Sequence, residues 1–137
     1  MPFHAYVFYS GDCAEAFERY REVFGGELTI MRNGDAPPDA RMPGTSDDTV
    51  MHASLKVGDG LLMGSDDPSG DGGPKVGFTV AYTAPDIATA NRVFEALVDG
   101  GEAIMPMQAT FWSSCFGMCT DRFGVPWMVD TDAEPSS

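Results

Sequence analysis

The chain has 137 residues, of which 43% are hydrophobic and 11% aromatic, enough for one domain with a buried core. Its 21 acidic and 8 basic residues give a formal net charge of −13, which disfavours nucleic acids and anionic membranes as partners. No apolar run approaches the roughly 20 residues of a membrane-spanning helix, and no basic and apolar leader opens the chain, so we expect a cytoplasmic protein. The three cysteines are too few for a disulfide scaffold and fit reduced thiols.

The first half of the chain predicts one strand, one helix and three further strands. Residues 4–9 are β-prone and lead to Asp12, which can cap a helix, with Glu15 three residues later. One helical face then carries the apolar residues Cys13, Phe17, Tyr20 and Phe24. Two glycines end the helix directly after Phe24. Strands are predicted at residues 28–31, 50–57 and 61–65, where apolar residues alternate with polar ones or form short runs. A glycine-containing hairpin turn joins the last two of these strands.

The second half repeats this order after a Pro- and Gly-rich connector at residues 68–74. Four helix positions of the first half, Asp12, Ala16, Tyr20 and Val23, recur at one constant separation as Asp86, Ala90, Phe94 and Leu97. Strands are expected at residues 78–83, 103–107, 115–120 and 125–130. Each half is therefore βαβββ. We expect a single domain over residues 1–137, with module one at about 3–66, module two at about 76–130 and an acidic tail at 131–137.

A βαβββ half covers one face of its sheet with its helix and leaves the other face bare. Two such halves must pair to bury or share the bare faces. The repeat therefore predicts a cleft between two curved sheets.

Three strings give a more specific signal: VMHASLKVGDGLLMGSD, GGEAIMPMQATFW and FGMCTDRFGVPWMVD. Together with the repeat, they resemble the vicinal-oxygen-chelate superfamily (glyoxalase, bleomycin resistance proteins and dioxygenases), and within it the PhnB-like branch. The resemblance covers about residues 4–130. It implies the α+β fold of two βαβββ modules, most often as a homodimer. A methyltransferase label that this branch sometimes carries is the weakest of the functional interpretations, because no glycine-rich S-adenosylmethionine loop follows the first strand.

The resemblance also implies where metal ligands should lie, namely on the first and fourth strands of each module. Carried over position by position, these places hold His4 and Gly64 in module one, and Phe78 and Met128 in module two. Only His4 can bind a metal, whereas a catalytic divalent ion takes about three protein donors. We therefore expect no metal and no other cofactor.

His52 lies on the polar face of its predicted strand, opposite Met51, Ala53 and Leu55, and should point to the cleft. It is the candidate acid/base residue, although a histidine hydrogen-bonded to a neighbouring strand or to a dimer partner fits equally well. Aromatic side chains at alternate strand positions, or in the turn before residue 115, would line the cleft or fill it: Tyr6, Phe8, Phe78, Tyr82, Phe111 and Trp112.

Four further residues complete the candidate ligand-binding set. Asp66 shares the expected cleft parity with Leu62 and Gly64, which makes it the acidic ligand anchor to test first. Cys115 shares the parity of His52, but no neighbour lowers its pKa, which favours a small buried role over a nucleophile. The other two are His4, at the start of the first strand, and Met128, whereas Trp127 has the opposite parity and should serve the core.

These features favour a metal-independent binding protein that holds a small planar aromatic or cationic molecule, such as an antibiotic in a resistance role. The alternative is an enzyme. It would be a glyoxalase-like lyase or isomerase with a relocated metal on His4 and His52, or a metal-free catalyst with His52 as acid/base. The expected partners are a neutral or cationic small molecule and a second copy of the chain.

Overall fold

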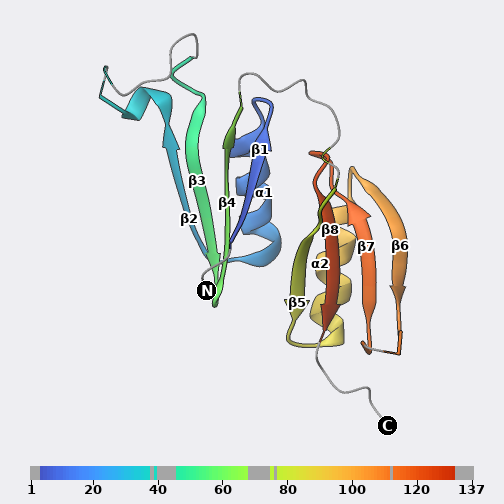
Figure 1. The fold of residues 1–137 in the computed structure, drawn as a ribbon. Coiled ribbons are helices and arrows are strands. Elements are labelled where there is room, and N and C mark those ends of the chain that lie inside the picture. Colours follow the sequence, from blue (N-terminus) through green and yellow to red (C-terminus); the bar gives the residue numbers. More distant parts are fainter. Residues whose placement is uncertain are drawn as a thin grey trace. The chain divides into compact units, whose positions relative to one another are not determined.

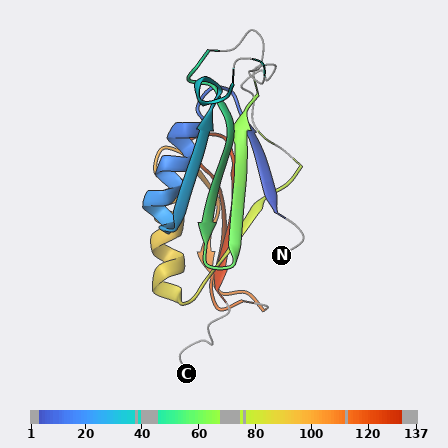
Figure 2. The same cartoon turned by 90° about the vertical axis from the view of Figure 1, so that its left-hand side faces the viewer.

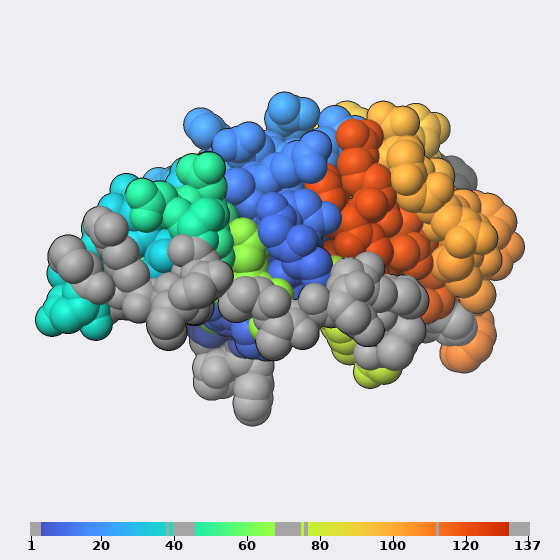
Figure 3. Space-filling model, turned by 90° about the horizontal axis from the view of Figure 1, so that it is seen from above, coloured from blue at the N-terminus to red at the C-terminus, as the bar shows by residue number. Residues whose placement is uncertain are grey.

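The computed structural model describes residues 4–37, 39, 46–67, 75, 77–111 and 113–131. The remaining residues, drawn in grey in Figures 1 and 3, include the predicted connector and almost all of the predicted tail, which lie outside the described residues. The chain divides into two compact units, Met1–Gly72 and Gly73–Ser137. Among the described residues, no helix is long and apolar enough to cross a membrane.

Unit 1 is a four-stranded sheet with one α-helix on one face (Figure 2). Its strands follow the spatial order β1-β4-β3-β2, with β1 parallel to β4 and the other pairs antiparallel. Its elements are β1 (Ala5–Tyr9), α1 (Cys13–Phe24), β2 (Glu27–Arg32), the short 3-10 helix η1 (Asn33–Asp35), β3 (Val50–Val57) and β4 (Gly60–Asp66).

Unit 2 has the same topology, with the order β5-β8-β7-β6 and α2 packed on its sheet (Figure 1). Its elements are β5 (Val80–Ala84), α2 (Ile87–Val98), β6 (Glu102–Gln108), β7 (Phe116–Thr120) and β8 (Pro126–Thr131). Both units are therefore βαβββ, and the predicted α+β fold of two modules is confirmed.

The core of unit 1 forms where α1 meets the sheet. Tyr9, Phe17 and Tyr20 are buried and make edge-on ring contacts, with ring centroids 5.9 Å apart for Tyr9 and Phe17 and 5.6 Å apart for Phe17 and Tyr20. Gly64 lies on this face, because a Cβ added there would be 2.9 Å from Cε1 of Phe17. The positions in register with Gly64, Val7 and Ala53, are buried on the same side.

The core of unit 2 forms where α2 meets β7 and β8. A Cβ added to Gly117 would be 3.0 Å from Cε1 of Phe94, so Gly117 and its partner Val129 face the helix. Trp127 has the same parity and is buried, as predicted, and its indole N–H donates to Oδ2 of Asp121 at 2.8 Å. Oδ1 of Asp121 accepts from the backbone N–H groups of Phe123 and Val125, so the turn before β8 is held by one buried carboxylate.

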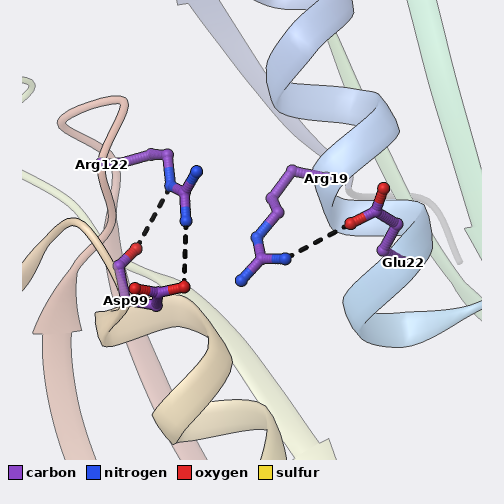
Figure 4. Close-up of polar contacts among 4 residues, drawn as sticks. All are labelled: Arg19, Glu22, Asp99 and Arg122. Carbon is purple, nitrogen blue, oxygen red and sulfur yellow. Dashed lines mark hydrogen bonds and ion pairs between the residues drawn. The ribbon is translucent and has the colours of Figure 1, made fainter.

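The same turn is tied to the end of α2 by Arg122 (Figure 4). Its Nε donates to the carbonyl oxygen of Asp99 at 3.2 Å and its Nη2 to Oδ2 of Asp99 at 3.3 Å. On α1, Arg19 pairs with Glu22 one turn later at 3.3 Å. Because both pairs are partly or largely exposed, each contributes little to the free energy of unfolding.

The two helices begin differently, although the sequence predicts an aspartate cap for both. Oδ1 of Asp86 accepts from the backbone N–H of Thr89 at 2.7 Å, as an N-cap does. Asp12 makes no such bond, and the N–H of Cys13 donates instead to Asp66, at the end of β4. Asp12 therefore occupies the predicted N-cap position of α1, but the side-chain cap expected of it is absent.

We expect Asp86→Ala to lower the midpoint of thermal unfolding by roughly 4 °C near neutral pH, and Asp12→Ala to lower it by less than half as much. The hydrogen bonds from Thr89 lower the pKa of Asp86 below its ordinary value of 3.8. The stabilisation is therefore present above pH 3.8 and lost as the pH falls through the lower, folded-state pKa. Thermal melts of both variants across this range test the prediction. Equal shifts for the two variants would contradict it.

Candidate functional site

The face of the unit 1 sheet opposite α1 carries the residues that alternate with the buried set. Tyr6 lies opposite Met63, Phe8 opposite Ser65, and Met31 opposite His52 in the strand registers. Tyr6 is 41% and Phe8 58% exposed, so this face presents aromatic surface to solvent. We call it the open face of unit 1, formed by Tyr6, Phe8, Met31, His52, Ser54, Met63 and Ser65.

Three rings gather on this open face. The ring centroid of Tyr6 lies 5.4 Å from that of Phe8 and 5.7 Å from that of His52. The hydroxyl of Tyr6 is 3.3 Å from Nδ1 of His52 in an exposed hydrogen bond whose direction depends on the tautomer. Tyr6 and His52 come from β1 and β3, which both flank β4, so the sheet brings together residues far apart in sequence. We call these three residues the ring cluster.

The structure thus places three of the predicted site residues together. His52 points away from Ala53 and Leu55, as its parity predicted. Its hydrogen bond to the hydroxyl of Tyr6 on β1 is of the kind expected if His52 has a structural role. His4 is exposed and precedes β1 by one residue. Among the described residues, no hydrogen bond or ring contact joins His4 to His52.

Asp66 does not belong to this face. It is 7% exposed, and its Oδ1 accepts from the N–H groups of Gly11 and Cys13 at 3.1 and 3.0 Å. Its Oδ2 accepts from the N–H of Val50 at 3.0 Å. The prediction that Asp66 faces the cleft as a ligand anchor is wrong, because its parity with Gly64 turns it to the side that carries α1. Its carboxylate instead joins the end of β4 to the starts of α1 and β3.

The face of the unit 2 sheet opposite α2 carries Met128, as expected from its parity, because Trp127 and Val129 face the helix. In register, Met128 lies between Ala81 and Met118, and Met118 lies opposite Met105. A second row across the strands comprises Thr83, Asp130, Phe116 and Gln108. These two rows define the open face of unit 2, and Oδ1 of Asp130 accepts from Oγ1 of Thr83 at 2.9 Å.

Tyr82 does not lie on that face, contrary to prediction. It is in register with Val129 and so shares the side of α2. The reason is a shorter connection: Ser10 and Gly11 separate β1 from Asp12, whereas Pro85 alone separates β5 from Asp86. Strand positions of unit 2 that are inferred by counting back from Asp86, as positions of unit 1 are counted back from Asp12, are therefore wrong by one residue.

The same shift corrects the counterpart of His4. Tyr9 pairs with the last residue of β4, and Ala84 with the last residue of β8, so Tyr9 corresponds to Ala84. His4 then corresponds to Thr79, and the assignment of that place to Phe78 is wrong.

The remaining aromatic candidates lie outside the strands. Phe78 precedes β5 and is 44% exposed, and Phe111, in the connection from β6 to β7, is 97% exposed. Trp112 lies outside the described residues. Their part in a ligand site stays a prediction.

Cys115 is buried, and its Sγ lies 3.7 Å from Oδ1 of Asn91 on α2. Its expected parity with His52 is therefore wrong, because it faces the helix. Burial raises the pKa of the Cys115 thiol, which agrees with the small buried role and opposes a nucleophile.

The other two thiols are also protected. Burial, with smaller effects of Asp66 and Asp12, raises the pKa of Cys13 from 9.0 to about 12. Burial and the charge of Asp121 raise the pKa of Cys119 from 9.0 to about 11. The stability linked to these shifts is full below pH 9.0 and declines as the pH rises toward 11 and 12, because the unfolded thiols ionise first.

We expect the folded protein to resist iodoacetamide in mildly alkaline buffer, with all three thiols labelled only after unfolding. Intact-mass spectrometry with and without denaturant measures this difference. Labelling of Cys13 or Cys119 at similar rates in both conditions would contradict their burial.

The metal positions implied by the resemblance can now be tested against the side chains. Gly64 faces α1 whereas Met128 faces away from α2, so the assignment of the fourth-strand place to Gly64 is wrong, and Met63, in register with Tyr6, corresponds to Met128. Met63 and Met128 both offer thioethers, and Thr79 takes the place given to Phe78. Within residues 4–37, 39, 46–67, 75, 77–111 and 113–131, no group of three or more His, Cys, Asp or Glu could hold a metal ion. The described donors do not fit a divalent site built from these positions.

Comparison with known proteins agrees with the fold. Residues 3–129 match the Glyoxalase/Bleomycin resistance protein/Dioxygenase superfamily. The protein YjdN of Escherichia coli (strain K12) is 31% identical over 140 residues, covering 95% of each chain.

Two solved structures are similar over nearly their whole length. The crystal structure of protein PA1353 from Pseudomonas aeruginosa is 38% identical with a TM-score of 0.87, covering 98% of this chain and 99% of that one. A putative 3-demethylubiquinone-9 3-methyltransferase, PhnB protein, from Bacillus cereus is 22% identical with a TM-score of 0.76, covering 96% and 99%, and shows a shared fold. On the match of residues 3–129 and the curated relative, the chain belongs to the glyoxalase/bleomycin resistance protein/dioxygenase superfamily.

Proposed function

We propose that the protein binds a small planar aromatic or cationic molecule without a metal, and that the ring cluster on the open face of unit 1 holds it. The observation that carries the proposal is the clustering of Tyr6, Phe8 and His52 at exposed positions of a sheet. Aromatic side chains left exposed on one face gain free energy when a ligand covers them. A planar group can stack on these rings, with the Tyr6 hydroxyl and the His52 nitrogens at its edge.

The charge of the chain selects among planar ligands. A net charge of −13 attracts cations and repels anions over the whole surface. A cation over a tyrosine or phenylalanine ring gains about 0.5–1 kcal/mol when exposed and about 2 kcal/mol when desolvated. The preferred ligand is therefore a planar molecule that is neutral or positively charged.

The superfamily includes both bleomycin resistance proteins and dioxygenases, so membership alone does not choose between binding and catalysis. The poor fit of the described donors to a divalent site favours binding. A resistance role against an antibiotic, a cytoplasmic location and a homodimer belong to the same proposal.

A second candidate function is metal-free catalysis with His52 as acid or base. The 3.3 Å contact of its Nδ1 with the Tyr6 hydroxyl favours this candidate, because such a contact orients the ring and leaves Nε2 for a substrate. A third version, a lyase or isomerase with a metal on His4 and His52, needs those residues to meet. Elemental analysis of untagged protein tests the metal version. Turnover that persists in His52→Gln would dispose of the metal-free one.

Calorimetric titration of chelator-treated protein tests the binding proposal. The probes are berberine, a planar cation, and 1-anilinonaphthalene-8-sulfonate, an aromatic anion. We expect berberine to bind with measurable heat and the anion to bind more weakly, because the chain is strongly acidic. Absence of heat with berberine and a panel of planar cationic antibiotics would remove the support for the proposal.

A further inference from the structure

β2 forms one edge of the unit 1 sheet. Among the described residues it pairs only with β3, so the sheet does not continue on its other side. From Glu27 to Met31 the register with β3 is regular, and the irregularity comes only after Met31. No proline interrupts the strand. The backbone N–H and C=O groups of such an edge are a template for another strand.

The corresponding edge of unit 2 lacks this regularity. β6 contains Pro106, which has no backbone N–H to donate. Its register with β7 shifts between Ala103 and Met105 and again between Met105 and Gln108. Proline and bulges both hinder pairing at a sheet edge. Of these two equivalent edges, β2 is therefore the one suited to pairing.

A groove of about 450 Å3 lies between β2 and α1. Leu28 lines it and is half-buried, whereas Leu55, its partner in register, is buried. Glu18, Arg21 and Glu22 of α1 are exposed and surround the groove with charges of both signs. The helix thus leaves apolar surface of the edge strand partly uncovered.

We propose that β2 and this groove form an interface between two copies of the chain, in which the two β2 strands pair antiparallel about a two-fold axis at Thr29. Opposite residues then share a face, and Leu28 lies opposite Ile30 of the second copy, so two half-buried apolar side chains meet. An axis at Ile30 would set Leu28 opposite Arg32 instead. This inference rests on the homodimer of the proposed function and names its surface.

The same axis brings the charged groove of one copy against that of the other. Neighbouring strands are about 4.8 Å apart, so the two β3 strands, and the α1 helices that pack mainly on them, are roughly 14 Å apart. Helices in direct contact are only about 8–10 Å apart, so long side chains must bridge the gap. Arg21 of each copy then faces Glu18 and Glu22 of the other, as the self-complementarity of a two-fold interface requires.

Reciprocal charge reversal on the full chain, followed by analytical ultracentrifugation, tests the interface. Arg21→Glu makes all three groove charges negative, and the double variant Glu18→Arg, Glu22→Arg makes all three positive. We expect a dimeric wild type, a dissociation constant raised at least about tenfold in each variant alone, and recovery to within about twofold in an equal mixture. Arg92→Glu is the matched control, because it reverses the same charge at an exposed position of α2 and should leave the dimer intact.

Single cysteines on β2 test the register. In Thr29→Cys the two thiols face each other across the axis, where opposite Cβ atoms are about 5 Å apart, and mild oxidation should join them. In Glu27→Cys, at another exposed position of the same face, the two thiols are roughly 14 Å apart and should stay reduced. The native cysteines are buried and should not compete.

Four results would overturn the inference and leave the homodimer in place: a dimer that both charge variants preserve, a mixture that fails to recover, an equal loss in Arg92→Glu, or cross-linking that is no greater in Thr29→Cys than in Glu27→Cys. A monomeric wild type would overturn the homodimer as well and leave the edge to a strand of another protein. None of these results bears on berberine binding, which tests the ligand proposal separately.

Discussion

Replacing Asp66 with asparagine is expected to lower the free energy of unfolding by about 3 kcal/mol, because hydrogen bonds to a buried charged acceptor are each worth about 1.5–3 kcal/mol. The amide keeps one oxygen for Gly11 and Cys13 but turns an NH2 group toward the N–H of Val50. One buried donor then loses its acceptor, and the charge is removed from all three bonds. Urea unfolding followed by circular dichroism gives the change.

Asp12→Asn is the control for Asp66→Asn, because Asp12 lies at the same helix end without a side-chain cap bond. We expect it to cost less than about 1 kcal/mol. The lost charge at Asp66 should also lower the pKa of Cys13, which Asp66 raises. If Asp66→Asn unfolded at the same urea concentration as Asp12→Asn and the wild type, the role of Asp66 in joining β4 to α1 and β3 would be refuted.

Truncating either exposed ring of the ring cluster is expected to weaken berberine binding by about tenfold, and truncating both to abolish measurable binding. The variants are Tyr6→Ala and Phe8→Ala, whose rings lie 5.4 Å apart and are exposed. Because the rings are exposed, their loss should leave the folded state nearly as stable as before. Calorimetric titration gives the affinity, and a thermal melt checks the fold.

Ile104→Ala is the matched control for these variants. Ile104 is a large apolar side chain that is 58% exposed, as Phe8 is, but lies on β6 in the other unit. We expect its removal to leave berberine affinity unchanged. Equal affinity losses in Ile104→Ala and Phe8→Ala would indicate nonspecific apolar binding and count against the ring cluster as the site.

The sequence predicted the fold because each element carried its own local signal. Helical spacing of apolar residues located α1 and α2, and alternation in β3 turned His52 away from Ala53 and Leu55. These signals depend only on the period of the element in which they occur. Recognition of the repeat then added the pairing of two βαβββ units.

The errors arose where a face had to be carried from one element to another. The constant spacing of the helix repeat did not extend into the strands, because Pro85 replaces a two-residue connection, and Tyr82 and Phe78 were therefore misplaced. In β4 both parities are apolar, with Leu61 and Met63 on one side and Leu62 on the other, so alternation could not show which side α1 covers. Only the register of Gly64 with Val7 and its approach to Phe17 place Asp66 on the helix side.

The central claim is that the ring cluster binds its ligand without a metal. Its most direct test is a titration of chelator-treated, isotope-labelled protein with berberine, followed by NMR and accompanied by elemental analysis. We predict that berberine shifts the resonances of Tyr6, Phe8 and His52 even though a chelator is present. We also predict that adding zinc or manganese leaves the affinity for berberine unchanged. Binding that appears only after a divalent metal is added, or a stoichiometric metal in the protein as purified, would contradict the account.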